Sequence, residues 1–177
     1  MSAPSAEDLW PSLDESLGRQ PCFPSGPVWS VLPTLKGQMA DMLTEMKSRY
    51  RRKKGTYIDD SNGIVHIDES AIIEPGVHII GPAYIGPNAI IRHAAYIREY
   101  SWICANALVG HSSETKHSIL LPGATINPSS TVIASNSGID WDHYSSKVQC
   151  WTVCFRHFWN YFLVNSIPRQ LFERWRH

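Results

Sequence analysis

The sequence predicts a mainly β protein, a parallel β-helix with three-sided coils, and two features of its 177 residues lead to this prediction. From Ile67 to Leu121 every sixth residue is aliphatic except Thr115, although only 37 residues of the chain are Ile, Val or Leu. Four places after each of these positions stands a residue that is mostly small, from Ala71 to Thr125. A coiled coil repeats every seven residues and an amphipathic helix every 3.6, so neither produces this pattern.

Each six-residue unit is expected to form one short strand and one corner, with the aliphatic side chain inside the coil and the small residue at the turn. Three units close one coil, so residues 18 apart stack about 4.8 Å from each other. Each buried Ile or Val then contributes about 1.5–3 kcal/mol. We place the β-helix at residues 60–126, with about three coils. An ordinary β-meander would alternate with a period of two, which is not the pattern here.

Two segments precede the predicted β-helix. Residues 1–30 contain five prolines from Pro4 to Pro27 and are expected to be a loosely ordered leader. Residues 31–54 are expected to be an α-helix and a basic connector, with Pro33 in the first helical turn. One helical stripe carries Leu35, Met39, Met42, Leu43, Met46 and Tyr50. Six of the sixteen basic residues lie between positions 47 and 54, which fits either a solvated helix end or a phosphate-binding patch.

Composition excludes several classes of protein. Sixteen basic and sixteen acidic residues balance, so no bulk charge favours a nucleic acid or a membrane as partner. The first residues lack the basic start and apolar run of a secretion signal. No apolar stretch approaches the roughly 20 residues that span a bilayer. Four scattered cysteines form no disulfide framework, so we expect reduced thiols and a cytoplasmic protein.

The six-residue units and the segment before them resemble the bacterial hexapeptide-repeat transferases, closely from about residue 28 to 125. The stretch "VWSVLPTLKGQM" is similar to the segment before the solenoid in stand-alone relatives of the UDP-N-acetylglucosamine pyrophosphorylase and glucosamine-1-phosphate acetyltransferase family. The stretch "AYIREYSWICANALVGHSSETKHSILLPGA" resembles the coil of that family that carries the sugar-phosphate site. The resemblance implies a left-handed β-helix and a homotrimer with its sites between subunits.

The resemblance also implies a ligand site. In the family two basic residues bind the phosphate and sugar of the acceptor, and they fall on Arg98 of "IREY" and Lys116 of "ETKH". The 18-residue separation independently stacks these two cations on one face. Like charges on adjacent rungs repel unless an anion lies between them. We therefore expect a UDP-sugar or sugar phosphate at Arg98 and Lys116; the alternative is that both side chains extend into water.

The catalytic base of the family has no counterpart here. Its histidine lies twelve residues after the lysine, a position that is Pro128 in this chain, and the tyrosine three places later is Thr131. Proline cannot act as a base, so no catalytic residue is assigned. The later coils that hold acetyl-CoA in the family also have no match, so no cofactor site is assigned. The functional hypotheses are an incomplete transferase-like protein without that base, or a non-catalytic solenoid for oligomerisation or binding.

A third hypothesis is a trimeric metalloenzyme that resembles the γ-class carbonic anhydrases. His93 and His111 are 18 residues apart and should stack, and His117 occupies the same slot on the next face. No Asp or Gln around them matches the anhydrase pattern, so hydrogen bonding at the surface or a trimer interface is the alternative, and no metal site is assigned.

Cysteines give weaker candidates. Cys150, Cys154 and His157 have a C-x3-C-x2-H spacing but lack the second ligand pair of a structural zinc site. A nucleophilic thiol at Cys104 would need a positioned base, and the sequence offers none.

Residues 127–177 are expected to repeat weakly and then to form an irregular or helical tail. Asn127 interrupts the series, and only Ile133 and Ile139 keep its phase. From residue 140 the chain is rich in tryptophan and matches nothing in the family. Two hypotheses explain this: a shifted reading frame that replaces later coils, or an amphipathic element that caps the open end of the solenoid.

Overall fold

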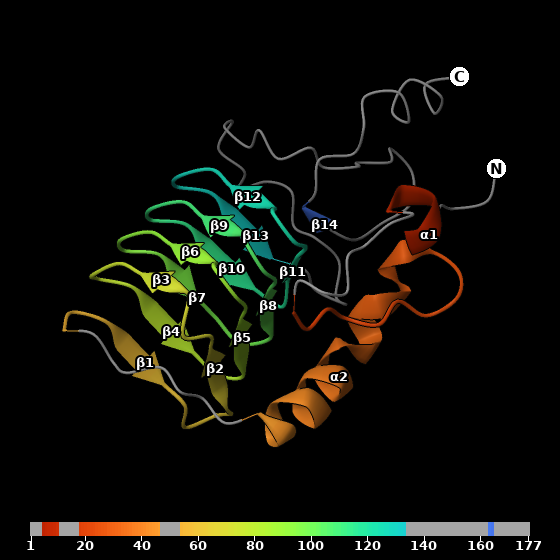
Figure 1. Ribbon diagram of the computed structural model, residues 1–177, viewed down its shortest axis with the longest axis horizontal. Coiled ribbons are helices and arrows are strands. Elements are labelled where there is room, and N and C mark those ends of the chain that lie inside the picture. Colours follow the sequence, from red (N-terminus) through yellow and green to blue (C-terminus); the bar gives the residue numbers. More distant parts are fainter. Residues whose placement is uncertain (1–4, 11–17, 47–53, 134–162, 165–177) are drawn as a thin grey trace.

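The computed structural model describes residues 5–10, 18–46, 54–133 and 163–164 (Figure 1). Its helices are α1 (Ala6–Leu9), the 3-10 helix η2 (Val28–Ser30) and α2 (Val31–Glu45). Its strands are β1 (Tyr57–Asp59), β2 (Val65–Ile67), β3 (Ile72–Ile73), β4 (His78–Ile80), β5 (Ala83–Ile85), β6 (Ile90–Ile91), β7 (Tyr96–Ile97), β8 (Ser101–Ile103), β9 (Leu108–Val109), β10 (Glu114–Lys116), β11 (Ile119–Leu120), β12 (Thr125–Ile126), β13 (Thr131–Ile133) and β14 (Leu163–Val164).

The strands stack in three parallel sheets that form the sides of a β-helix. Sheet A has the order β1-β4-β7-β10-β13, sheet B the order β14-β11-β8-β5-β2, and sheet C the order β12-β9-β6-β3. Successive strands pass from one sheet to the next, so β1 to β12 make four coils and β13 begins another. The predicted fold class, a mainly β parallel β-helix preceded by an α-helix, is confirmed. The coils extend beyond the predicted range of 60–126 at both ends, because β1 begins at Tyr57 and β13 ends at Ile133.

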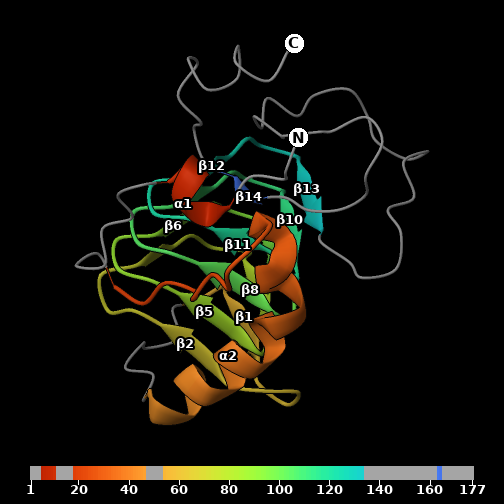
Figure 2. The ribbon, with the colours of Figure 1, turned by 90° about the vertical axis from the view of Figure 1, so that its right-hand side faces the viewer.

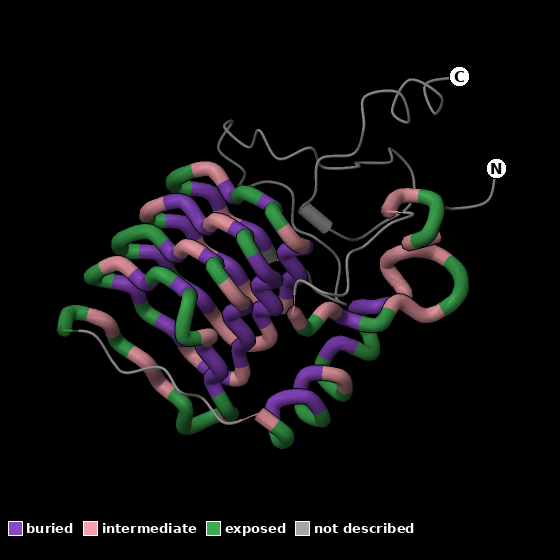
Figure 3. The backbone as a smooth tube through the Cα atoms, in the orientation of Figure 1, coloured by how far each residue is buried: buried purple, intermediate pink, exposed green. Residues whose placement is uncertain are grey.

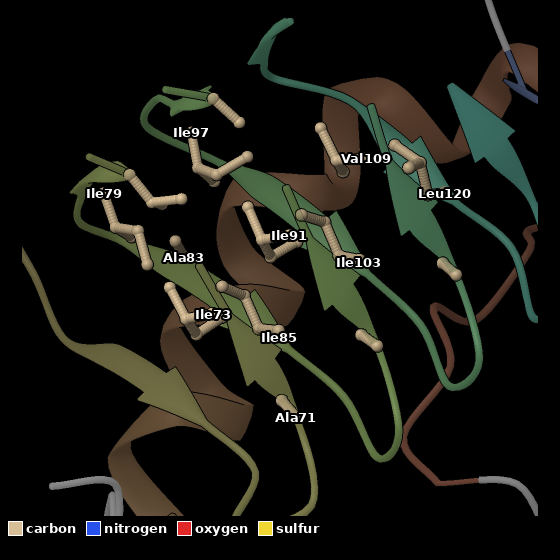
Figure 4. Packing of buried hydrophobic residues seen from close by; sticks show 14 of the residues in the cluster. Ala71, Ile73, Ile79, Ala83, Ile85, Ile91, Ile97, Ile103, Val109 and Leu120 are labelled. Carbon is tan, nitrogen blue, oxygen red and sulfur yellow. The ribbon is translucent and has the colours of Figure 1, made fainter. Parts of the chain in front are cut away.

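The interior of the coils is filled by the residues that recur every sixth position. In the first three coils the predicted aliphatic residues are at most 2% exposed, and Figure 4 shows their side chains pointing into the coil. These inward residues are Ile67, Ile73, Ile79, Ile85, Ile91, Ile97, Ile103 and Val109. Thr115 also lies inside, where its hydroxyl is 3.0 Å from the hydroxyl of Ser101. Buried positions therefore recur regularly along each coil (Figure 3).

Left-handed backbone at the corners explains the six-residue period. The third residue after an inward aliphatic residue has a positive φ in several coils, for example 54° at Asn88, 55° at Ala94 and 58° at Asn106. This conformation turns the chain sharply, although it costs an L-residue about 1–2 kcal/mol. The next residue is small and buried, as at Ala89 and Ala95, so that its side chain fits inside the corner. The small residues therefore mark the turns, as predicted.

One prediction about the interior is wrong, because the repeat slips by one residue. Leu121 was expected to point inward, but Leu120 pairs with Ile103 and occupies the interior. Thr115 pairs with Ile97, so five residues of the upper coil match six of the lower one at this corner. Leu121 is instead buried in the apolar cluster that includes α2.

The slip also changes the interpretation of the residues after 126. From Leu120 the six-residue period continues through Ile126 and Val132, which both belong to the interior cluster. Asn127 therefore does not interrupt the repeat, and Val132 rather than Ile133 takes the next inward position.

Helix α2 covers the outer face of sheet B. Most of the predicted stripe is buried there, including Leu35 and Met39, against Tyr84, Trp102 and Ile119. Figures 1 and 2 show α2 running along the stack of coils, across successive strands of this sheet. The helix ends at Glu45, and residues 47–53 with the basic connector and Tyr50 lie outside the described residues. None of the helices in the described segments has the length and apolar character needed to cross a bilayer.

Part of the expected loose leader packs against this assembly. Helices α1 and η2 both lie within residues 1–30. The indole N–H of Trp102 donates to the carbonyl of Arg19 at 3.2 Å. The side chain of Gln38 accepts from the backbone N–H of Cys22 and donates to its carbonyl, both at 2.8 Å. These contacts hold residues 18–30 against α2 and sheet B.

Strand β14 extends sheet B at its C-terminal end, where Leu163 pairs with Ile119 and Val164 with Leu120. The tail was expected to be irregular or helical, but its described residues after 133, Leu163 and Val164, form this strand. The candidate ligands Cys150, Cys154 and His157, and Ile139, lie outside the described residues.

Candidate functional site

The predicted ligand residues Arg98 and Lys116 lie at the same end of sheet A on adjacent rungs. Thr115 of β10 pairs with Ile97 of β7, and the two basic residues directly follow this pair. Lys116 ends β10, and Arg98 is the first residue after β7. The structure thus brings these two residues together, as their 18-residue separation predicts.

Arg98 is held by two carboxylates. Its Nη1 donates to Oε1 of Glu114 at 2.9 Å, and its Nε lies 3.6 Å from Oε2 of Glu99. The guanidinium also lies 5.6 Å from the ring centroid of Tyr96. The hydrogen bond from Arg98 to Glu114, more than the charges of Glu99 and Glu114, raises the pKa of Arg98. Arg98 therefore stays protonated, with its charge balanced and its side chain oriented by acidic neighbours.

Lys116 lies in a corner that is one residue shorter than the corresponding corner of the coil below. It is followed at once by His117, whose φ is 49° and whose backbone N–H donates to the carbonyl of Glu99 at 2.9 Å. Two residues, Arg98 and Glu99, occupy the corresponding place in the coil below, before Tyr100 at φ 60°. Within the described segments Lys116 forms no ion pair. Its ammonium charge is therefore not balanced in the way that the charge of Arg98 is.

His93 and His111, the two stacked histidines of the metalloenzyme hypothesis, lie one above the other as predicted. The rings of His93 and His111 are 4.9 Å apart at an angle of 7°. Nδ1 of His93 is 3.4 Å from Glu74, which also accepts from Arg92 at 2.7 Å. Hydrogen bonds from Arg92, and then from the backbone of His93, lower the pKa of Glu74. The carboxylate therefore holds Arg92 and His93 at the corner after β6.

No third ligand joins this histidine pair in the described part of the chain, where no group of three or more metal-ligating residues occurs. His117 lies at a different corner, after β10, with its ring 5.6 Å from that of Tyr100. The zinc hypothesis thus has two stacked imidazoles but no complete ligand set within the described residues.

The remaining sequence candidates have environments unsuited to catalysis. Pro128 follows β12, and its backbone packs so closely on Gly110 that a side chain at residue 110 would collide with it. Neither Pro128 nor Thr131, which begins β13, offers a base. Cys104 is fully buried between sheet B and α2, and burial strongly raises the pKa of its thiol. A thiol held protonated is a poor nucleophile.

Several residues near Arg98 and Lys116 were missed by the sequence interpretation. Glu99 and Glu114 engage Arg98, and Tyr100 contacts Lys36 from α2. Glu114 could have been placed from the sequence, because it lies 18 residues after Tyr96 and therefore pairs with it on the next rung. The contact of Lys36 depends on how the helix packs and has no signal in the spacing.

Neither a protein-family model nor a curated protein matches the chain. The hexapeptide-repeat transferase resemblance therefore stays a prediction, and the parallel β-helix stands on the structure alone.

Proposed function

We propose that this protein is a non-catalytic relative of the hexapeptide-repeat transferases that binds a sugar phosphate or a nucleotide sugar such as UDP-N-acetylglucosamine. The observation that carries the proposal is the placement of Arg98 and Lys116 on adjacent rungs at one end of sheet A. Arg98 is paired with carboxylates but Lys116 forms no ion pair among the described residues, so an anion that contacts both side chains would balance the charge of Lys116. One N–H of Arg98 donates to Glu114, and the guanidinium has five N–H donors, so others are available to a phosphate.

Acetyl transfer by the mechanism of the family is not part of this proposal. The position of the base is Pro128, which has no group that accepts a proton at neutral pH. No acetyl-CoA site is assigned in the chain. The proposed role is therefore binding, with the carboxylates of Glu99 and Glu114 orienting Arg98 toward the ligand.

Isothermal titration tests the proposal. UDP-N-acetylglucosamine and glucosamine 1-phosphate are titrated into the unmodified protein and into Arg98→Ala, Lys116→Ala and Arg92→Ala. Arg92 is the matched control, because it is an arginine paired with a carboxylate on sheet C. We expect binding to weaken roughly tenfold or more in the first two variants, the value of a charged hydrogen bond, and to stay unchanged in the control. Absence of binding by the unmodified protein to both ligands would refute the proposal.

We further propose that the protein assembles as a homotrimer through sheet C. Ile72, Ile90 and Leu108 stand in register on the outer face of this sheet, and Ile72 is 49% exposed. Ile90 and Leu108 are partly exposed, and a contiguous apolar patch on the surface is typical of a protein interface. This observation also favours the alternative function, a solenoid module for oligomerisation.

Sedimentation equilibrium distinguishes a trimer from the 20.0 kDa monomer. The variant Ile72→Lys is expected to shift the population toward monomer, whereas Ile64→Lys serves as control, because Ile64 is exposed but lies between β1 and β2. A monomeric unmodified protein at high concentration would exclude the trimer and leave the sugar-phosphate proposal to the titration.

A further inference from the structure

A second group of charged residues lies where α2 meets the short corner after β10. The ammonium of Lys36 is 4.9 Å from the ring centroid of Tyr100. The ring of His117 is 5.6 Å from the same tyrosine ring, and Lys116 directly precedes His117. We call Lys36, Tyr100, Lys116 and His117 the Tyr100 cluster. It combines one residue of the helix with three residues from the ends of two coils.

Positive charge in the Tyr100 cluster is not balanced within the described residues. Neither Lys36 nor Lys116 forms an ion pair there. The nearby carboxylates, Glu99 and Glu114, are both engaged by Arg98. Two lysines without acidic partners beside one histidine attract an anion.

His117 supplies the second indication of a ligand. Its Nε2 is buried and has no hydrogen-bond partner, an arrangement that is costly for a polar atom. Burial lowers the pKa of His117, and the charges of Lys36 and Lys116 lower it further, against the opposing effect of a hydrogen bond to the backbone of Leu32. Both lysines are thus close enough to disfavour protonation of the imidazole. An anion bound among the three groups would instead favour the protonated imidazole.

The short corner explains why these groups meet. In the coil below, two residues separate Ile97 from the left-handed residue Tyr100, whereas Lys116 alone separates Thr115 from His117. With one residue fewer, Lys116 at the end of a strand of sheet A is followed directly by the left-handed residue His117, at the corner that leads into sheet B, whose outer face α2 covers. Tyr100, one coil below His117, lies beside Lys36 and holds its ammonium at the ring face.

The geometry points to the Tyr100 cluster as a phosphate-binding site. Lys36 and Lys116 contact phosphoryl oxygens as point charges, and protonated His117 donates a hydrogen bond through Nε2. For the identity of the natural ligand this inference rests on the proposed function, because Lys116 belongs to both. It adds that the phosphate contacts α2 through Lys36, so that ligand binding ties the helix to the solenoid.

Titration with inorganic phosphate and with UDP-N-acetylglucosamine tests this site on the full chain. The variants are Lys36→Gln, His117→Asn and the control Lys54→Gln, an exposed lysine before β1. Asparagine tolerates the left-handed backbone at residue 117, so His117→Asn keeps the corner. We expect Lys36→Gln and His117→Asn to weaken phosphate binding roughly tenfold each, and Lys54→Gln to leave it unchanged. Equal urea midpoints for Lys36→Gln and the unmodified protein would show that this variant is folded.

The imidazole itself gives an independent measurement. Phosphate should raise the pKa of His117 by about one pH unit if it binds the protonated imidazole about tenfold more tightly than the neutral one. NMR titration of the His117 ring measures this pKa. The groups that face the imidazole of His117 are Lys36 and the backbone of Leu32 from α2, Lys116 beside it, and the Tyr100 ring. An unchanged His117 pKa at saturating phosphate would overturn the inference.

The outcomes separate this site from the proposed function. Binding of phosphate that depends on Lys36, without binding of either the nucleotide sugar or glucosamine 1-phosphate, supports the cluster and refutes the proposed ligand. Binding of the nucleotide sugar that is lost in Arg98→Ala but retained in Lys36→Gln and His117→Asn supports the proposed function and overturns the cluster.

Discussion

Replacing Ile73 by alanine is expected to destabilise the protein much more than the same replacement at Ile72, although the two residues are neighbours on β3. Ile73 points into the coil and is 2% exposed, whereas Ile72 faces outward and is 49% exposed. Full burial of an isoleucine contributes about 1.5–3 kcal/mol. The cavity left inside a packed coil increases the loss for Ile73 to about 2–5 kcal/mol. Ile72 loses about half of the burial contribution and leaves no cavity, so its cost is about 1 kcal/mol.

Urea unfolding followed by circular dichroism measures this difference. With a slope of about 2 kcal/mol per molar urea, in the middle of the usual range, Ile73→Ala should lower the midpoint by about 1–2.5 M. The experiment is run at two protein concentrations, because a cost at Ile72 that grows with concentration reports self-association through sheet C. A concentration-independent loss at Ile72 equal to that at Ile73 would refute the inward and outward assignment of the hexads.

Three further predictions concern single side chains. Burial lowers the pKa of His66 from its ordinary value of 6.5, so the stability that neutral His66 provides is complete above pH 6.5 and is lost as the pH falls toward the folded-state pKa. His66→Phe should therefore reduce the decrease of the urea midpoint on acidification. An equal decrease in the variant and the unmodified protein would contradict a lowered pKa of His66. Trp102→Phe removes the hydrogen bond to Arg19 and part of a buried side chain, so it should cost about 1–3 kcal/mol, with faster proteolysis between residues 18 and 30. Unchanged proteolysis would show that this contact does not hold the leader. Native iodoacetamide labelling mapped by mass spectrometry should modify exposed Cys22 and spare buried Cys104, whose thiol pKa is raised; equal labelling would place Cys104 in contact with solvent.

The interior of the first coils was predictable because the aliphatic residue of each six-residue unit both fills the core and sets the register of its strand. Ile67 to Val109 keep a constant six-residue separation, and the stacking of Arg98 with Lys116 follows from the same period. The slip at residue 116 was not visible locally, since Leu120 and Leu121 are both leucine and either fits the interior. The residues that indicate the slip come later in the sequence, because Ile126 and Val132 continue the six-residue period from Leu120 and not from Leu121.

Other parts of the structure depend on contacts between distant segments, which spacing does not encode. The first strand was missed because inward Ile58 lies nine residues before Ile67 rather than six. Lys36 reaches Tyr100 only because α2 packs on sheet B in one particular orientation. For the same reason the Tyr100 cluster was not predicted, although Arg98 and Lys116 were.

Helix α2 has a consequence for the size of the solenoid. Its 15 residues make a rod of roughly 22 Å, which matches four to five strand spacings of about 4.8 Å. It touches Tyr84, Trp102 and Ile119, one from each of three successive coils. The length of α2 therefore fits a particular number of coils. Deletion of one whole coil would keep the remaining strands in register, but part of α2 would extend past sheet B and expose its leucine and methionine side chains to water.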